Sequence, residues 1–243
     1  MKKLLVLSAI VIAASGAAQA QVLFSNGSAV NAPGTPNAGL SVLTAPATSF
    51  GATSSATQTL ADNFAVTGAP WSVQSLDFFG YQTGAAGFTF TNVSWSILAG
   101  TDINSAALVS SGTTNVTNGG LVGYRVLSTA LTLTNRAIYR INADIPDLEL
   151  AEGNYFVTFA LAGTSASGPF VPPVAGTLGT GNAFFKSSTG TSFFPVTDGG
   201  SLQPFDVPFS IQGSVIPEPS TYALMLAGGL SIGAIVRRRR QQG

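Results

Sequence analysis

The side chains that most often carry acid–base or nucleophilic chemistry are missing, because this chain has no histidine and no cysteine. Their absence excludes Ser-His-Asp and Cys-His arrangements and the usual zinc and non-haem iron sites. Carboxylates remain, and a pair of them can hydrolyse a glycosidic bond. Of the ten acidic residues, Glu218 lies near the C-terminus, and the others are Asp62, Asp77, Asp102, Asp144, Asp147, Glu149, Glu152, Asp198 and Asp206.

Four of these carboxylates cluster in sequence around one expected turn: Asp144, Asp147, Glu149 and Glu152. Such a cluster can be ordinary hydrated surface, a site for a hard cation such as calcium, or part of a catalytic centre. Hydration is the simplest interpretation, because acidic residues are mostly exposed. We therefore expect no enzyme activity and no cofactor, and we keep the four residues as calcium candidates only.

Aromatic side chains offer a second kind of candidate, a platform on which sugars stack. The residues for it are Trp71, Trp95, Tyr81 and Tyr124. Trp95 alternates with serines, however, which favours a place in the core. Asp102-Ile103-Asn104 and Asp198-Gly199-Gly200 are typical of turns.

The elements that must position these side chains are strands, because apolar residues recur with a period of two rather than 3.6. In the segment from Ala137 to Ile145, every second residue is apolar, and Arg140, Asn142 and Asp144 occupy the other face. One apolar face toward the core and one polar face toward solvent are typical of an antiparallel sheet. The apolar phase slips by one residue between Phe90 and Val93, so a continuous strand there needs a β-bulge.

Two later segments carry more specific signals. Leu150, Gly153 and Tyr155 resemble the tyrosine corner of β-sandwiches, in which the phenol hydroxyl bonds to upstream backbone. The segment from Phe205 to Gln212 alternates apolar and polar residues and carries Pro208 on its polar face. Since proline cannot donate to a ladder, this strand is expected at a sheet edge or with its proline unpaired.

The sequence thus predicts an all-β fold, an antiparallel, jelly-roll-like β-sandwich at residues 57–214. No segment between Gln21 and Ser214 has helical periodicity. Residues 21–56 are rich in Gly, Ala, Ser, Thr, Pro and Asn, which predicts a loose arm with one short strand near Val22 to Phe24. The whole exported part is mildly acidic, and its only basic residues are Arg125, Arg136, Arg140 and Lys186. That is too little positive charge for nucleic-acid binding.

The N-terminal end is typical of a secretory signal peptide at residues 1–20. Lys2 and Lys3 form a basic start, Leu4 to Ala14 is largely apolar, and Ala18-Gln19-Ala20 is a small-x-small cleavage site. We expect a signal peptidase to cut between Ala20 and Gln21 after passage through the secretion translocon. A retained anchor is the alternative, but so short an apolar run is a poor membrane span.

The C-terminal end combines three features in order. Pro217, Glu218 and Pro219 form a stiff, extended strip, because closely spaced prolines exclude regular helix. Residues 222–236 carry no charge and predict a transmembrane helix about 23 Å long, shorter than the roughly 30 Å hydrocarbon core. Four arginines then act as a stop-transfer signal and keep the C-terminus in the cytoplasm: Arg237, Arg238, Arg239 and Arg240.

This order of features resembles the PEP-CTERM sorting signal of Gram-negative bacteria, over residues 215–240 only. The resemblance implies recognition of Pro217-Glu218-Pro219 by exosortase, a membrane-embedded cysteine transpeptidase that cuts nearby and passes the ectodomain to the cell surface. The helix would be a transient inner-membrane anchor. Tyr222 departs from the family, which more often has Trp there, but an interfacial tyrosine is a conservative replacement. A permanent single-span anchor is the alternative.

The expected function is therefore that of an exported, non-catalytic surface or extracellular-matrix protein. The resemblance also implies an association with exopolysaccharide and biofilm. Two alternatives stay open: a carbohydrate-binding module, and a secreted hydrolase that uses paired carboxylates.

Overall fold

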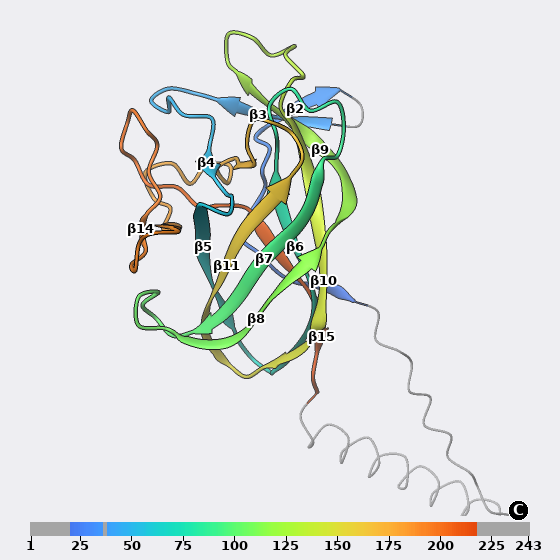
Figure 1. The fold of residues 1–243 in the computed structure, drawn as a ribbon, viewed down its shortest axis with the longest axis vertical. Helices are drawn as coiled ribbons and strands as arrows, with labels where there is room; N and C mark the ends of the chain where they lie inside the picture. Colours follow the sequence, from blue (N-terminus) through green and yellow to red (C-terminus); the bar gives the residue numbers. More distant parts are fainter. Residues whose placement is uncertain (1–19, 36–37, 218–243) are drawn as a thin grey trace, which may run out of the picture.

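The computed structural model describes residues 20–35 and 38–217 of the chain. Within these residues the fold is all-β, with strands in two large curled sheets and one two-stranded sheet, and no helix (Figure 1). Accordingly, the described part has no helix suited to crossing a membrane. The expected signal peptide and the expected C-terminal helix lie outside the described residues.

The first large sheet contains both ends of the folded domain. Its order is β1 (Gln21–Ser25), β15 (Phe209–Val215), β6 (Trp71–Gly80), β10 (Ala137–Leu150), β9 (Thr117–Leu127), β3 (Ala38–Leu43) and β2 (Ala32–Thr35). Neighbouring strands are antiparallel except β3 and β9, which run parallel. The expectation of an antiparallel sheet therefore holds for all but this pair.

The second large sheet faces the first. Its order is β14 (Phe194–Pro195), β13 (Phe184–Ser187), β5 (Gln58–Val66), β11 (Gly153–Gly163), β7 (Phe90–Ala99) and β8 (Ala107–Asn115). A small sheet pairs β4 (Ala52–Thr53) with β12 (Phe170–Val171). All of these pairs are antiparallel, and only β7 with β8 and β13 with β14 are consecutive in the chain.

The core lies between the two sheets and follows the period-two pattern. Ile141 and Ala143 of β10 are fully buried, while Arg140 and Asp144 on either side of them are exposed. Phe78 of β6 stacks on a phenylalanine of β11 with ring centroids 4.5 Å apart, so the inner faces interdigitate. Each such buried side chain contributes about 1.5–3 kcal/mol by leaving water. The architecture is β-sandwich-like.

Two local predictions from the sequence are confirmed. Phe90 pairs with Gly163 and Asn92 with Ala162, so Thr91 is the extra residue of a β-bulge in β7. Tyr155 donates its hydroxyl to the backbone carbonyl of Ala151 at 2.9 Å, as a tyrosine corner requires.

Two other expectations differ from the structure, the first only in part. The strand expected from Phe205 begins at Phe209, and Pro208, expected on the polar face, is buried. β15 is flanked by β1 and β6, and its proline lies outside the paired residues, which is the second of the two expected arrangements. The segment expected to be a loose arm contributes β1 to β4. Glycines allow the backbone of β3 to lie very close to the backbone of β9, because a Cβ on Gly123 of β9 would collide with the Gly39 carbonyl of β3.

Candidate functional site

The end of β15 leads directly into the Pro-Glu-Pro strip. Val215, the last residue of β15, is the register partner of Trp71 in β6. One residue later, the Ile216 amide donates to the Pro70 carbonyl at 2.8 Å. Pro217 follows, is exposed, and has no amide to donate. Pairing with the sheet therefore stops at the first residue of the strip. Residues 218–243, which include Glu218, Pro219, the expected helix and the arginines, lie outside the described part.

The expected signal-peptide cut lies beside this exit. Ala20 is exposed, and Gln21 is the first residue of β1. Gln21 is the register partner of Gly213 in β15. The start of β1 and the end of β15 consequently share one end of the sandwich (Figure 1). We call this end the exit end.

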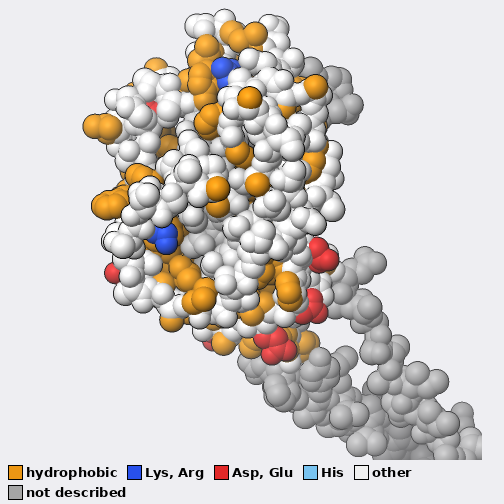
Figure 2. Space-filling view, viewed as in Figure 1, with side chains coloured by type: hydrophobic (Ala, Val, Ile, Leu, Met, Phe, Trp, Pro, Cys, Tyr) orange, Lys and Arg blue, Asp and Glu red, His pale blue; other side chains and the backbone are white. Residues whose placement is uncertain are grey.

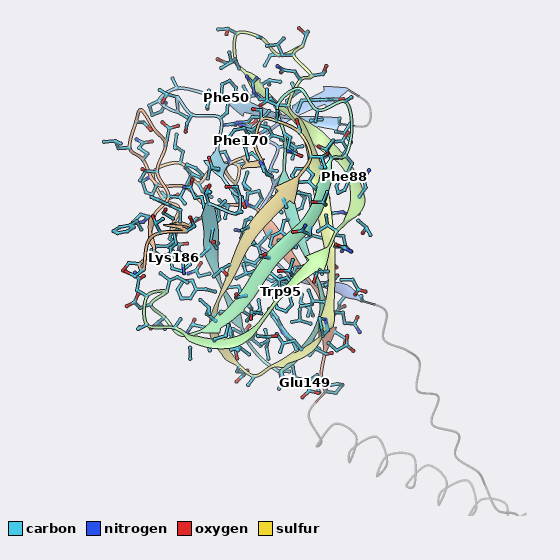
Figure 3. All side chains as sticks on the ribbon, in the orientation of Figure 1. Phe50, Phe88, Trp95, Glu149, Phe170 and Lys186 are labelled. Carbon is cyan, nitrogen blue, oxygen red and sulfur yellow. The ribbon has the colours of Figure 1, made fainter. Side chains whose placement is uncertain are left out.

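The four calcium candidates lie toward the exit end without forming a metal site. Asp144, Asp147, Glu149 and Glu152 are all exposed, and Glu149 lies at the opposite end of the molecule from Phe50 (Figure 3). Acidic side chains gather near this end on the surface (Figure 2). Nowhere in residues 20–35 and 38–217 do three Asp or Glu side chains group closely enough to hold a metal ion. Exposed like charges of this kind stay hydrated.

Asp198 is the most heavily bonded carboxylate of the described part, although its side chain is only 2% exposed. Its oxygens accept hydrogen bonds of 2.7–3.2 Å from the backbone amides of Thr48, Ser49, Gly200 and Ser201. The hydroxyls of Thr48, Ser49 and Ser201 donate to the same oxygens, within the same range of distances. Burial alone raises the pKa of Asp198, but these hydrogen bonds outweigh it and hold the pKa well below its usual range. The expected turn is present, and the carboxylate also fastens it to residues 48–49.

Arg125 holds the same loop from the other side. Its guanidinium is 4% exposed and donates to the carbonyls of Phe50 at 2.8 Å and Ser49 at 3.3 Å and to the Ser41 hydroxyl at 3.2 Å. Burial lowers the pKa of Arg125 to about 10, so the side chain stays charged at neutral pH. The Tyr81 hydroxyl also donates to the Phe50 carbonyl, at 3.0 Å. This buried polar cluster is structural, since Arg125 and Tyr81 both donate to backbone carbonyls of the loop at residues 49–50.

Asp62 is a second buried carboxylate, with a different environment. It is 1% exposed and accepts three hydrogen bonds, from the Asn26 side chain and the Val207 amide at 3.0 Å and from the Asn63 amide at 2.8 Å. Burial raises the pKa of Asp62 to about 7, and nearby Asp206 adds to the rise, while the three hydrogen bonds oppose it. A carboxyl that titrates near neutrality is a catalytic candidate in principle.

Substrate access argues against catalysis at these carboxylates. Two cavities of the described part, of about 70 and 390 Å³, have no carboxylate in their lining. Asp62 and Asp198 are each enclosed by hydrogen-bond donors of the chain itself. A general acid must reach a substrate atom directly or through one water. The geometry therefore supports a structural role for both residues.

The aromatic platform suggested by the sequence does not form. Trp71, Trp95 and Tyr81 are buried, and Tyr124 is half-buried. Trp95 donates its indole N–H to the Thr114 hydroxyl at 3.1 Å, which fixes it in the core as its alternation with serines indicated.

Comparison with known proteins adds one finding. The family model described as the PEP-CTERM protein-sorting motif matches residues 215–240. The chain therefore carries this sorting motif, whose presence implies an exported protein processed by an exosortase-type membrane protein. No curated protein matches the chain.

Proposed function

We propose that this chain is a non-catalytic surface or extracellular-matrix protein, whose β-sandwich is exported, anchored briefly in the inner membrane and released to the cell surface by an exosortase-type transpeptidase. The observation that carries this proposal is the PEP-CTERM motif, which begins at Val215, the last residue of the last strand. A domain that ends where a sorting signal begins is cargo for that signal.

Each part of the C-terminal segment has a separate role in this proposal. Pro217, Glu218 and Pro219 are the recognition element, kept extended because proline excludes helix. Residues 222–236 form the transient helix, and residues 237–240 stop translocation because moving four cations across a membrane is costly. At the other end, signal peptidase releases Gln21 after the chain has passed the translocon.

The absence of catalysis is supported by how the carboxylates are placed. No three carboxylates of the described residues group together, and the buried Asp62 and Asp198 are hydrogen-bonded to the chain itself. An association with exopolysaccharide or biofilm belongs to the same proposal, by analogy with other carriers of the motif. A carbohydrate-binding module and a paired-carboxylate hydrolase remain the competing functions. A glycan array and a glycosidase assay on the surface-released protein distinguish them.

The test separates recognition from retention in a host with and without the peptidase. Replacing Pro217, Glu218 and Pro219 with alanine should leave membrane insertion intact and abolish cutting, because alanine lets the helix extend through the strip. Replacing Arg237, Arg238, Arg239 and Arg240 with serine should instead weaken retention. Membrane fractionation and mass determination give both results. Normal cutting of the alanine variant would remove the recognition element from the proposal.

A further inference from the structure

The sorting segment and the sandwich share residues. The matched motif starts at Val215, which is still paired with Trp71 inside the first sheet. β15 is hydrogen-bonded on both sides, to β1 and to β6, up to Gly213, and to β6 alone beyond it. Since the Ile216 amide is also bonded, to Pro70, there is no free spacer between the folded domain and Pro217.

This junction limits how a peptidase reaches its substrate. Peptidases bind the chain on both sides of the cut in an extended form, through backbone hydrogen bonds. Each backbone amide donates one hydrogen bond, so an amide held by the sheet is not available to an enzyme. Resting on the proposed function above, we propose that Ser214, Val215 and Ile216 must detach from β6 before the cut, so that the folded sandwich restrains its own sorting.

The structure also indicates where such fraying stops. Val215 is 43% exposed, so its release uncovers little apolar surface. Gly213 is packed tightly instead: a Cβ there would collide with the Ser72 carbonyl and contact the Leu23 side chain. Opening residues 214–216 breaks a few hydrogen bonds at the end of a strand, which is the part of a sheet that opens most easily.

Two changes to the full chain test this in the host that contains the peptidase. A Gly-Ser-Gly-Ser insertion between Ile216 and Pro217 supplies the missing spacer, and the rate of cutting in a pulse-chase should rise roughly tenfold, the equivalent of one net hydrogen bond. The same insertion between Thr189 and Gly190, in an exposed turn, is the matched control and should leave the rate unchanged.

The second change locks the strand end. Ser72 and Ser214 are register partners, and the chain has no cysteine, so Ser72→Cys with Ser214→Cys forms an unambiguous cross-link. Cutting should stop and return when a reductant is added. The matched control is Ser94→Cys with Thr113→Cys on β7 and β8, where the two hydroxyl oxygens are 3.0 Å apart and the cross-link is remote from β15.

The outcomes separate this inference from the proposed function. If the wild-type chain is cut but the spacer does not accelerate cutting, or if the oxidised Ser72→Cys/Ser214→Cys chain is cut at the normal rate, the restraint is overturned while sorting stands. If the wild-type chain is never cut, the proposed function itself fails.

Discussion

The folded domain at residues 20–217 and the sorting segment at residues 215–240 use their polar residues in opposite ways. In the domain, the buried carboxylates accept hydrogen bonds from the chain itself and the buried guanidinium donates to its carbonyls. In the segment, two prolines, one glutamate and four arginines carry information by their order. The comparison teaches that the buried polar side chains of the sandwich stabilise its fold, whereas recognition depends on a short segment outside it. Changes in the domain away from the end of β15 should therefore alter stability and leave sorting intact.

The largest loss of stability is expected on replacing Asp198. Asp198→Ala leaves the amides of Thr48, Ser49 and Ser201 without their acceptor and should lower the free energy of unfolding by about 3–5 kcal/mol. Urea unfolding measures the loss. Asp147→Ala, at an exposed carboxylate, is the control and should change stability by less than about 0.5 kcal/mol.

The same pair of variants tests the division of roles. The fraction of folded chain that is cut by the peptidase should be equal in both variants and in the wild type. A cutting defect specific to folded Asp198→Ala would break the comparison, because it would give a buried residue of the domain a part in sorting.

A smaller change in stability is expected with pH, because of the raised pKa of Asp62. Because this pKa is raised from 3.8 to about 7, the folded chain holds a proton between these pH values that the unfolded chain releases. Stability should therefore be highest near pH 4, fall as pH rises toward 7 and level off above it, with a total loss of at most about 4 kcal/mol. Asp198 has the opposite sign, but its lowered pKa matters only below about pH 4.

Urea unfolding at pH 4.5, 6 and 7.5 measures this slope. Asp62→Asn keeps an acceptor for a neighbouring amide and cannot titrate, so its stability should be nearly flat over the same range. A wild-type chain that gains stability toward pH 7.5 would show that the three hydrogen bonds to Asp62 outweigh its burial.

The smallest effect is expected at the tyrosine corner. Tyr155→Phe removes the hydrogen bond to the Ala151 carbonyl and should lower the free energy of unfolding by roughly 1–2 kcal/mol. Phe194→Leu, at an exposed ring of the same sandwich, is the control and should be near neutral. An equal loss in both variants would mean that the corner bond contributes nothing specific.

The strands were predictable where side chains alternate between core and solvent. Ala137 to Ile145, the bulge before Val93 and the corner at Tyr155 all follow from local patterns of apolar and turn residues. The sorting motif was equally readable, since its signal lies in consecutive residues. These features need no information from distant parts of the chain.

The remaining features depend on distant partners. Asp198 looks like a turn residue, and its bonds to Ser49 connect positions 149 apart in sequence. Asp62 bonds to Val207 across 145 positions. The strands at residues 32–43 have little apolar pattern that could predict them. One of them, β3, is held in the sheet by parallel backbone pairing with β9. Only the folded topology shows these contacts.

The central claim, that the sandwich is cargo removed from its sorting segment, is tested most directly by the intact mass of the protein recovered from the cell surface. The account predicts a chain that begins at Gln21, allowing for loss of ammonia from an N-terminal glutamine, and that ends close to Pro217, without residues 222–240. A surface protein whose mass includes Arg240 would contradict it and identify a permanently anchored single-span protein instead.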